Sequence, residues 1–167
     1  MRATYLATVA AAALLFSVPA HALDAPKERV VLTVTGAIDE TNSPGQAEFD
    51  LAMLKALPGR SGAMETPWTE GQTRFEGPLL RSLLKAVGAH GRTLRITALN
   101  DYSAEVPIED ATEFDTMLAV AMNGEAMSIR DKGPIFMIYP FDTNPELYNE
   151  KYFSRSVWQI KAIEVTE

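Results

Sequence analysis

Cysteine is absent from the 167-residue sequence. Disulfide bonds, thiolate zinc sites, iron–sulfur clusters and cysteine nucleophiles are therefore excluded before any motif is considered. The phosphate-loop, zinc-protease and hydrolase motifs GxGxxG, GxxxxGKS/T, HExxH and GxSxG are missing as well. These absences remove most of the common sequence signatures of catalysis.

Long apolar runs are also missing, except at the N-terminus. Arg2 precedes the uncharged residues 3–18, and Pro19-Ala20-His21-Ala22 ends in an Ala-x-Ala cleavage pattern. The run is too short, and its flank too polar, for a membrane-spanning helix. We therefore expect a signal peptide over residues 1–22, a periplasmic location and a single domain over residues 23–167 that is not embedded in the membrane.

Basic side chains are outnumbered. Removal of residues 1–22 leaves 14 basic and 22 acidic side chains, a net charge near −8. Such a protein is a poor partner for nucleic acid. His90 is then the one remaining histidine, so a multi-histidine metal site is excluded and a Ser-His-Asp triad would depend on this residue, which precedes Gly91 and is expected on a surface loop.

The hydrophobic pattern predicts about seven strands and three short helices. Their order does not alternate strictly, which indicates an α+β fold with a mostly antiparallel or mixed sheet. Pro67 and Gly71 predict an irregular connection over residues 64–75, and residues 152–155 are expected to be a loop. The expected strands are 29–35, 93–99, 102–108, 117–122, 126–129, 134–139 and 157–165, and the expected helices follow Asp50, start at Pro78 and start at Asp142.

Acidic residues crowd residues 101–115, where no basic residue occurs. A cation site or a docking face is possible there, but the spacing does not match an EF-hand loop. We therefore expect a solvated hairpin and helix start, with these carboxylates in water.

Aromatic side chains gather on predicted loops and strand ends, close to a few charged groups. Flat rings beside a carboxylate and guanidinium groups suit a flat heteroaromatic ligand, because stacking supplies contact area while the charged groups read the ring edge. Core packing is the alternative for Phe75, Tyr139 and Trp158, and surface ion pairs are the alternative for Arg74 and Arg155. The candidate set contains Trp68, Phe75, Tyr102, Tyr139, Tyr152, Phe153 and Trp158, with Arg74, Asp101 and Arg155 beside them.

Six segments, in the same order, resemble the sulfite-oxidase-type molybdopterin-binding domain over roughly residues 34–165. They are FDLAMLKALP, RFEGPLLRSLLKAVG, ALNDYSAEVPIED, MLAVAMNGEAMS, GPIFMIYP and SVWQIKAIEV. The resemblance implies the compact α+β fold of that family, built on a mixed sheet with short helices.

Two departures from the family's redox enzymes bear on function. Those enzymes ligate molybdenum through a cysteine thiolate, which this chain lacks. They are usually exported already folded by the twin-arginine route, whereas a signal with Arg2 alone indicates general secretion of an unfolded chain, which carries no preassembled cofactor.

The segments TPWTEG and YFSRSVWQI most resemble a short, cysteine-free, secreted branch of the family. This resemblance implies a periplasmic receptor for a reduced pterin that works beside the periplasmic domain of a membrane-bound sensor, such as a cyclic-di-GMP enzyme or a histidine kinase. It implies no redox cofactor and no metal. The expected ligand contacts are Trp68 and Tyr102 against the ring, Asp101 at its N–H groups, Arg74, Ser154 and Arg155 at its carbonyl or hydroxyl groups, and Tyr139 and Trp158 in the same cleft.

Two other functions stay open at this point. One is a molybdopterin-dependent oxidoreductase subunit, and the other is an interaction module on the same fold that binds no ligand.

Overall fold

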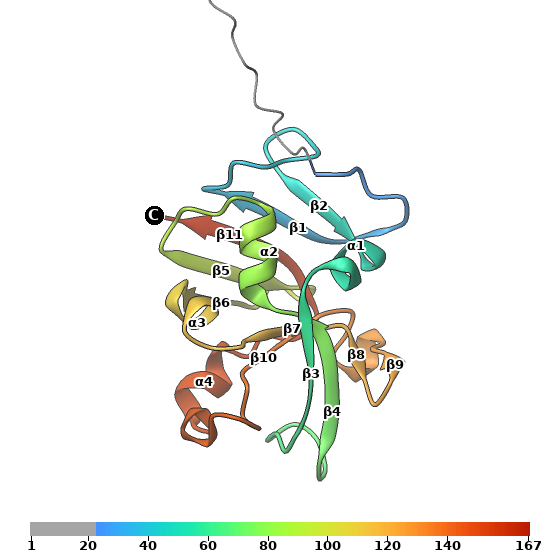
Figure 1. Ribbon diagram of the computed structural model, residues 1–167, viewed down its shortest axis with the longest axis vertical. Helices are drawn as coiled ribbons and strands as arrows, with labels where there is room; N and C mark the ends of the chain where they lie inside the picture. The colour runs from blue at the N-terminus through green and yellow to red at the C-terminus, as the bar shows by residue number, and fades with distance from the viewer. Residues whose placement is uncertain (1–22) are drawn as a thin grey trace, which may run out of the picture.

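A computed structural model describes residues 23–167 of the protein, and the predicted signal peptide lies outside these residues (Figure 1). Strands dominate, and the helices between them are short. The strands are β1 (Val30–Gly36), β2 (Ala47–Asp50), β3 (Gly59–Met64), β4 (Thr73–Pro78), β5 (Thr93–Ala98), β6 (Ser103–Pro107), β7 (Met117–Ala119), β8 (Ala121–Met122), β9 (Glu125–Ala126), β10 (Phe136–Ile138) and β11 (Ile160–Thr166).

Short helices connect the strands. None among residues 23–167 is long and apolar enough to cross a membrane. They are α1 (Leu51–Ala56), α2 (Leu80–Ala86), α3 (Glu109–Thr112), α4 (Glu150–Arg155) and the 3₁₀ turns η1 (Ile129–Asp131) and η2 (Pro145–Leu147).

The largest sheet has the strand order β2-β1-β11-β5-β6. β1 and β11 are parallel, with Thr33 opposite Ala162, whereas the other neighbours are antiparallel. The C-terminal strand therefore lies in the middle of the sheet beside the first strand, as Figure 1 shows. This mixed sheet with few helices confirms the α+β class expected from the sequence.

Two smaller sheets pack beside the large one. β10 pairs with β7, and the other sheet has the order β3-β4-β8-β9. The sequence pattern missed β3 and β4, because β3 is rich in small residues with low strand propensity. Its glycines allow close approach: a Cβ at Gly59 would lie 2.3 Å from the Gly77 carbonyl oxygen. Only residues 65–72 form the irregular connection.

Two helix predictions need correction. Pro78 ends β4, and α2 begins at Leu80, two residues later than expected. Residues 152–155, expected as a loop, belong to α4, whose first turn is capped by the Asn149 side chain accepting from the Lys151 amide. This helix buries no complete residue, so it has no apolar period that the sequence could reveal.

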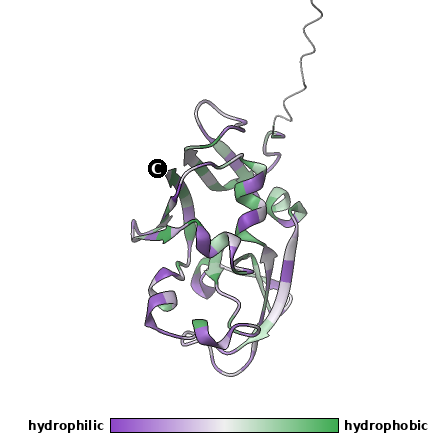
Figure 2. Cartoon of the chain, turned by 60° about the vertical axis from the view of Figure 1, so that its left-hand side comes forward, coloured by the Kyte–Doolittle hydropathy of each residue, from purple (hydrophilic) through white to green (hydrophobic). Residues whose placement is uncertain are grey.

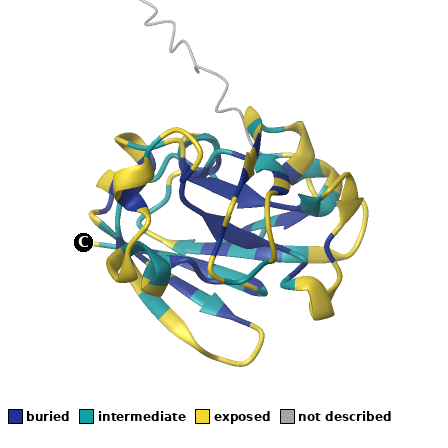
Figure 3. Ribbon diagram, turned by 90° about the horizontal axis from the view of Figure 1, so that it is seen from below, coloured by how far each residue is buried: buried dark blue, intermediate teal, exposed yellow. Residues whose placement is uncertain are grey.

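The hydrophobic core lies between the sheets and α2. Leu32 and Val34 of β1, Ile96 of β5 and Ile163 of β11 are fully buried. Hydrophobic residues follow the strands, and hydrophilic residues occupy most of the outer loops (Figure 2). Buried segments run through the middle of the molecule, and exposed loops and short helices surround them (Figure 3).

Candidate functional site

The turn between β5 and β6 forms one side of the candidate site. The Ala98 amide donates to the Tyr102 carbonyl oxygen at 2.8 Å, which closes the turn across Asn100 and Asp101. Asp101 adopts φ 66°, a left-handed conformation that Asn and Asp tolerate. The tight turn expected from this polar pair is confirmed.

The Asp101 side chain points to the neighbouring strand. Lys161 Nζ of β11 donates to its carboxylate at 2.5 Å, and the carboxylate is exposed. The hydrogen bond and the positive charge of Lys161 hold the pKa of Asp101 below its usual value of 3.8. This carboxylate is therefore ionised and already partnered at neutral pH.

A pocket of about 460 Å³ opens beside this turn. Its rings come from the β3–β4 connection, the turn before β6, α4 and the segment before β11. Its polar groups come from the same turn and from α4. We call it the aromatic pocket; it is lined by Trp68, Ala98, Asn100, Tyr102, Glu150, Phe153, Ser154, Ser156, Val157 and Trp158.

Trp68 is the centre of the aromatic cluster. Its ring makes edge-to-face contacts with Phe136 at 5.4 Å, Phe153 at 5.6 Å and Trp158 at 6.0 Å between centroids. Phe136 is fully buried, so its contact holds the Trp68 ring against the core. Trp158 is 39% exposed, so its expected alternative role in the core is wrong. The two tryptophans thus present ring surface at a pocket, a geometry that suits a flat ligand.

Polar groups of the pocket differ in how far they are already satisfied. Tyr102 Oη donates to the Ser154 carbonyl oxygen at 3.3 Å, and Ser154 Oγ donates to the Lys151 carbonyl oxygen at 2.9 Å. Within residues 23–167, the carboxylate of Glu150 has neither an ion pair nor a hydrogen bond. It is the acceptor that the pocket leaves available.

A buried polar cluster anchors α4 behind the pocket. Asp110 Oδ2 accepts from Tyr139 Oη at 2.6 Å and from Arg155 Nη1 at 2.8 Å. Burial, followed by the hydrogen bond and the charge of Asp110, raises the pKa of Tyr139 far above its usual value. Tyr139 therefore keeps its proton and donates at any physiological pH.

This cluster corrects one expectation about the acidic stretch. Asp110 is 5% exposed, not solvated, because Arg155 balances its charge and Tyr139 donates to it. Tyr139 is fully buried, as its alternative role in the core predicted. His90 lies on an exposed loop, 3.7 Å from Asp39, as expected.

The structure brings together four of the eight predicted ligand residues. Trp68, Tyr102, Ser154 and Trp158 line the aromatic pocket. Tyr139 and Arg155 lie behind it, on Asp110. Neither Asp101 nor Arg74 is in the lining.

Arg74 lies on the β3–β4 hairpin, where its Nη1 donates to Ser61 Oγ at 2.7 Å. The sequence analysis missed Asn100 and Glu150. Asn100 belongs to the predicted turn and lies two residues before the candidate Tyr102, so its position in the sequence could have indicated a place at the site. Glu150 could not be found in the same way, because the sequence of α4 has no apolar period that predicts a helix there.

The mixed sheet with its short helices makes this an α+β domain, and the aromatic pocket lies beside its β5–β6 turn. The family of the oxidoreductase molybdopterin binding domain matches residues 41–167, and the chain belongs to this family. No curated protein matches the chain.

The structure is similar to the crystal structure of the sulfane dehydrogenase SoxCD from Paracoccus pantotrophus. The TM-score is 0.61 and the sequence identity 18%, over 87% of this chain and 40% of that chain. The chain thus spans less than half of that protein. At this identity the likeness shows the fold alone.

The residues at the pocket do not fit a molybdenum-bearing cofactor. No cysteine is present to bind the metal, and residues 23–167 contain no group of three or more metal-binding side chains. The lining of the aromatic pocket includes no Lys or Arg for a phosphate group. The aromatic pocket thus offers neither a thiolate for the metal nor a cation for the phosphate group of such a cofactor.

Proposed function

We propose that the protein is a periplasmic receptor that binds an unphosphorylated, reduced pterin in the aromatic pocket and relays its occupancy to a membrane-bound signalling partner. The observation that carries this proposal is a pocket lined by two tryptophans and by a carboxylate that pairs with no described residue, with no Lys or Arg in the lining. The pyrimidine ring of a reduced pterin is flat and neutral, and it carries an amino group and a ring N–H donor along one edge. Each feature of the pocket has a counterpart in that ligand.

In this proposal the rings of Trp68, Tyr102 and Trp158 hold the ligand by stacking and edge contacts. Glu150 accepts from the amino and ring N–H groups, since a carboxylate makes stronger hydrogen bonds to paired donors than a neutral acceptor does. Ser154 and Asn100, which also line the pocket, meet the carbonyl and side-chain hydroxyl groups in the same proposal. Asp101 is the rival carboxylate, and taking that role would require it to leave Lys161.

Arg155 and Tyr139 act as supports in this scheme. Through Asp110 they fix α4, the helix that supplies Glu150, Phe153 and Ser154. Arg74 stays a candidate at the rim of the hairpin. The proposed partner is the periplasmic domain of a sensor such as a cyclic-di-GMP enzyme or a histidine kinase.

Family membership alone is equally consistent with a subunit of a molybdopterin-dependent oxidoreductase. The absence of cysteine from the sequence favours the receptor. Molybdenum content distinguishes the two functions: elemental analysis of protein purified from the periplasm gives about one molybdenum per chain for the oxidoreductase and none for the receptor.

Calorimetry under anaerobic conditions tests ligand binding directly. We expect tetrahydroneopterin to bind in a 1:1 ratio and to raise the thermal unfolding temperature, because a ligand bound only by the native state stabilises it. Guanosine, which shares the pyrimidine edge but has a different second ring and a bulky ribose, is the matched control. Equal heats for both compounds, or none for the pterin, would rule out the proposed ligand.

A further inference from the structure

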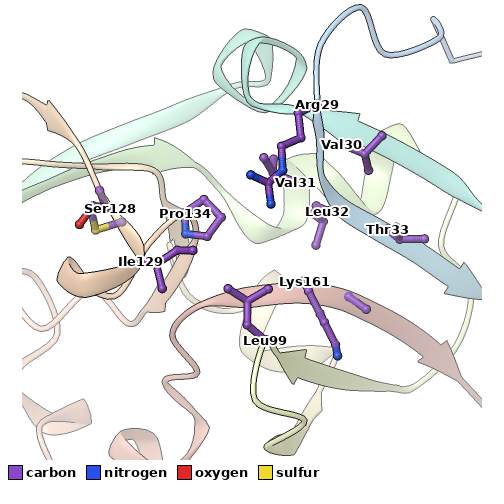
Figure 4. Close-up of a pocket in the computed structure, with 12 residues that line it drawn as sticks. Arg29, Val30, Val31, Leu32, Thr33, Leu99, Ser128, Ile129, Pro134 and Lys161 are labelled. Carbon is purple, nitrogen blue, oxygen red and sulfur yellow. The ribbon is translucent and has the colours of Figure 1, made fainter.

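A second cavity, of about 510 Å³, lies between β1 and the segment that follows β9 (Figure 4). Most of its lining side chains are aliphatic, and none is aromatic. We call it the aliphatic groove; it is lined by Arg29, Val30, Val31, Leu32, Thr33, Leu99, Met127, Ser128, Ile129, Pro134, Lys161 and Ala162.

Exposed apolar side chains are concentrated here. Val30 is 37% exposed, Leu99 41% and Ile129 53%, and these are three of the six large hydrophobic residues exposed within residues 23–167. Such side chains gathered at one cavity mark a contact surface, because their exposure to water is unfavourable until something covers them.

The charge of the groove is opposite to that of the protein. Its two charged lining residues, Arg29 and Lys161, are cations, whereas the whole chain has a net charge of −7. Lys161 is engaged by Asp101. Arg29 makes no ion pair or side-chain hydrogen bond with any residue from 23 to 167, and Figure 4 shows its side chain extending from the start of β1 toward the cavity.

The groove and the aromatic pocket share a wall. In the β5–β6 turn, Leu99 lines the groove and the adjacent Asn100 lines the pocket. The Leu99 amide donates to the Gln159 carbonyl oxygen at 2.9 Å. Gln159 Nε2 in turn donates to the Ile129 carbonyl oxygen at 2.7 Å, while its neighbour Trp158 lines the pocket.

We propose that the aliphatic groove is the docking surface for the signalling partner, and that it receives a protein segment with a large apolar side chain next to a carboxylate. The apolar side chain covers Leu99 and Ile129, and the carboxylate pairs with Arg29. A pterin in the aromatic pocket contacts Asn100 and Trp158, which belong to the same shared wall as Leu99 of the groove. This inference rests on the proposed receptor function, because a relay requires a surface for the partner.

The experiment selects displayed random dodecapeptides on the immobilised protein, residues 23–167, without pterin. We expect enriched sequences that place a Leu, Ile or Phe beside an Asp or Glu. One synthetic consensus peptide is then titrated by fluorescence anisotropy. Leu99→Ser is expected to weaken its binding about tenfold and Arg29→Gln about fivefold.

Matched controls separate the groove from the rest of the surface. Tyr148→Ser removes another exposed hydrophobic residue, and Arg92→Gln removes another exposed cation. Both should leave peptide affinity within about twofold of the unchanged protein. No enrichment, a basic consensus, or equal binding by the groove variants and the controls would overturn the proposal.

Two other occupants are detected in the same preparation. A fatty acid found by mass spectrometry in the unchanged protein but not in Leu99→Ser, or a dimer in sedimentation that Leu99→Ser dissociates, would assign the groove elsewhere. Saturating tetrahydroneopterin should change the peptide Kd at least about threefold, with the reciprocal effect on the pterin Kd. If the pterin fails to bind, the proposed receptor function is wrong, and the peptide result still decides whether the groove is a docking surface. If the pterin binds but does not change the peptide Kd, the proposed relay is overturned.

Discussion

The aromatic pocket and the aliphatic groove are neighbours of similar size with opposite chemistry. Within residues 23–167, the pocket offers rings and one carboxylate without a partner, whereas the groove offers aliphatic side chains and one guanidinium group without a partner. Rings and an acceptor suit a flat donor-rich molecule, and aliphatic surface with a cation suits an acidic protein segment. The difference shows how one small sheet can hold a ligand and a partner on two sides of a single turn.

The largest predicted effect concerns the ion pairs beside the two cavities: Asp110 is buried behind the aromatic pocket, whereas the Lys161–Asp101 pair at the groove is exposed. Asp110→Ala leaves the partly buried Arg155 without its carboxylate and Tyr139 without its acceptor, so it should lower the free energy of unfolding by about 3 kcal/mol in urea denaturation. Lys161→Gln breaks an exposed pair at the groove and should leave stability close to that of the unchanged protein. Equal losses of unfolding free energy in the two variants would mean that the Asp110 cluster stabilises the fold no more than an exposed ion pair does.

The aromatic rings should matter for pterin and not for the groove. Trp68→Ala is expected to weaken pterin binding roughly thirtyfold in calorimetry, because an aromatic stack contributes about 2 kcal/mol. Trp68→Phe retains the packing against Phe136 and should recover part of the loss. Leu99→Ser, across the shared wall, serves as the control that leaves pterin affinity unchanged in the absence of partner.

Tyr139, behind the aromatic pocket, should make the free energy of unfolding depend on pH in the alkaline range. Its folded pKa is raised, so the stabilisation is present below the unfolded value near 10 and is lost as pH rises above it. At about pH 11 the protein should lose about 1.4 kcal/mol of unfolding free energy through this group. Tyr139→Phe should lack this loss and Tyr148→Phe should retain it; identical pH profiles for all three proteins would contradict the assignment.

The smallest expected effect is on pterin binding, and it distinguishes two carboxylates: Glu150 of α4 and Asp101 of the β5–β6 turn. Glu150→Gln should weaken pterin binding about fivefold, since an amide is a weaker acceptor for paired N–H donors. Asp101→Asn should leave it within about twofold, because Lys161 already holds that side chain. The reverse order, measured by calorimetry, would assign the ring edge to Asp101.

Strands with strong local patterns could be read from the sequence. The β-branched run of β1, the alternation of β5 and β6, and the Asn123-Gly124 turn with φ of 53° and 84° follow from short-range preferences. The sequence also indicated that Trp68 lies on a connection, since Pro67 precludes a regular strand there. Four of the eight residues predicted to contact a ligand line the aromatic pocket.

Tertiary contacts decided the rest. α4 has no apolar period and is held by Asn149 and by the Arg155–Asp110 pair, partners 45 residues apart. That distant pair also explains why Asp110 is buried and why Glu150 reaches the aromatic pocket. The groove at Arg29 exists because β11 returns beside β1. Composition alone determined that no thiolate is present and that acids outnumber bases; which side chains meet across a cavity depended on long-range packing, which local propensity does not encode.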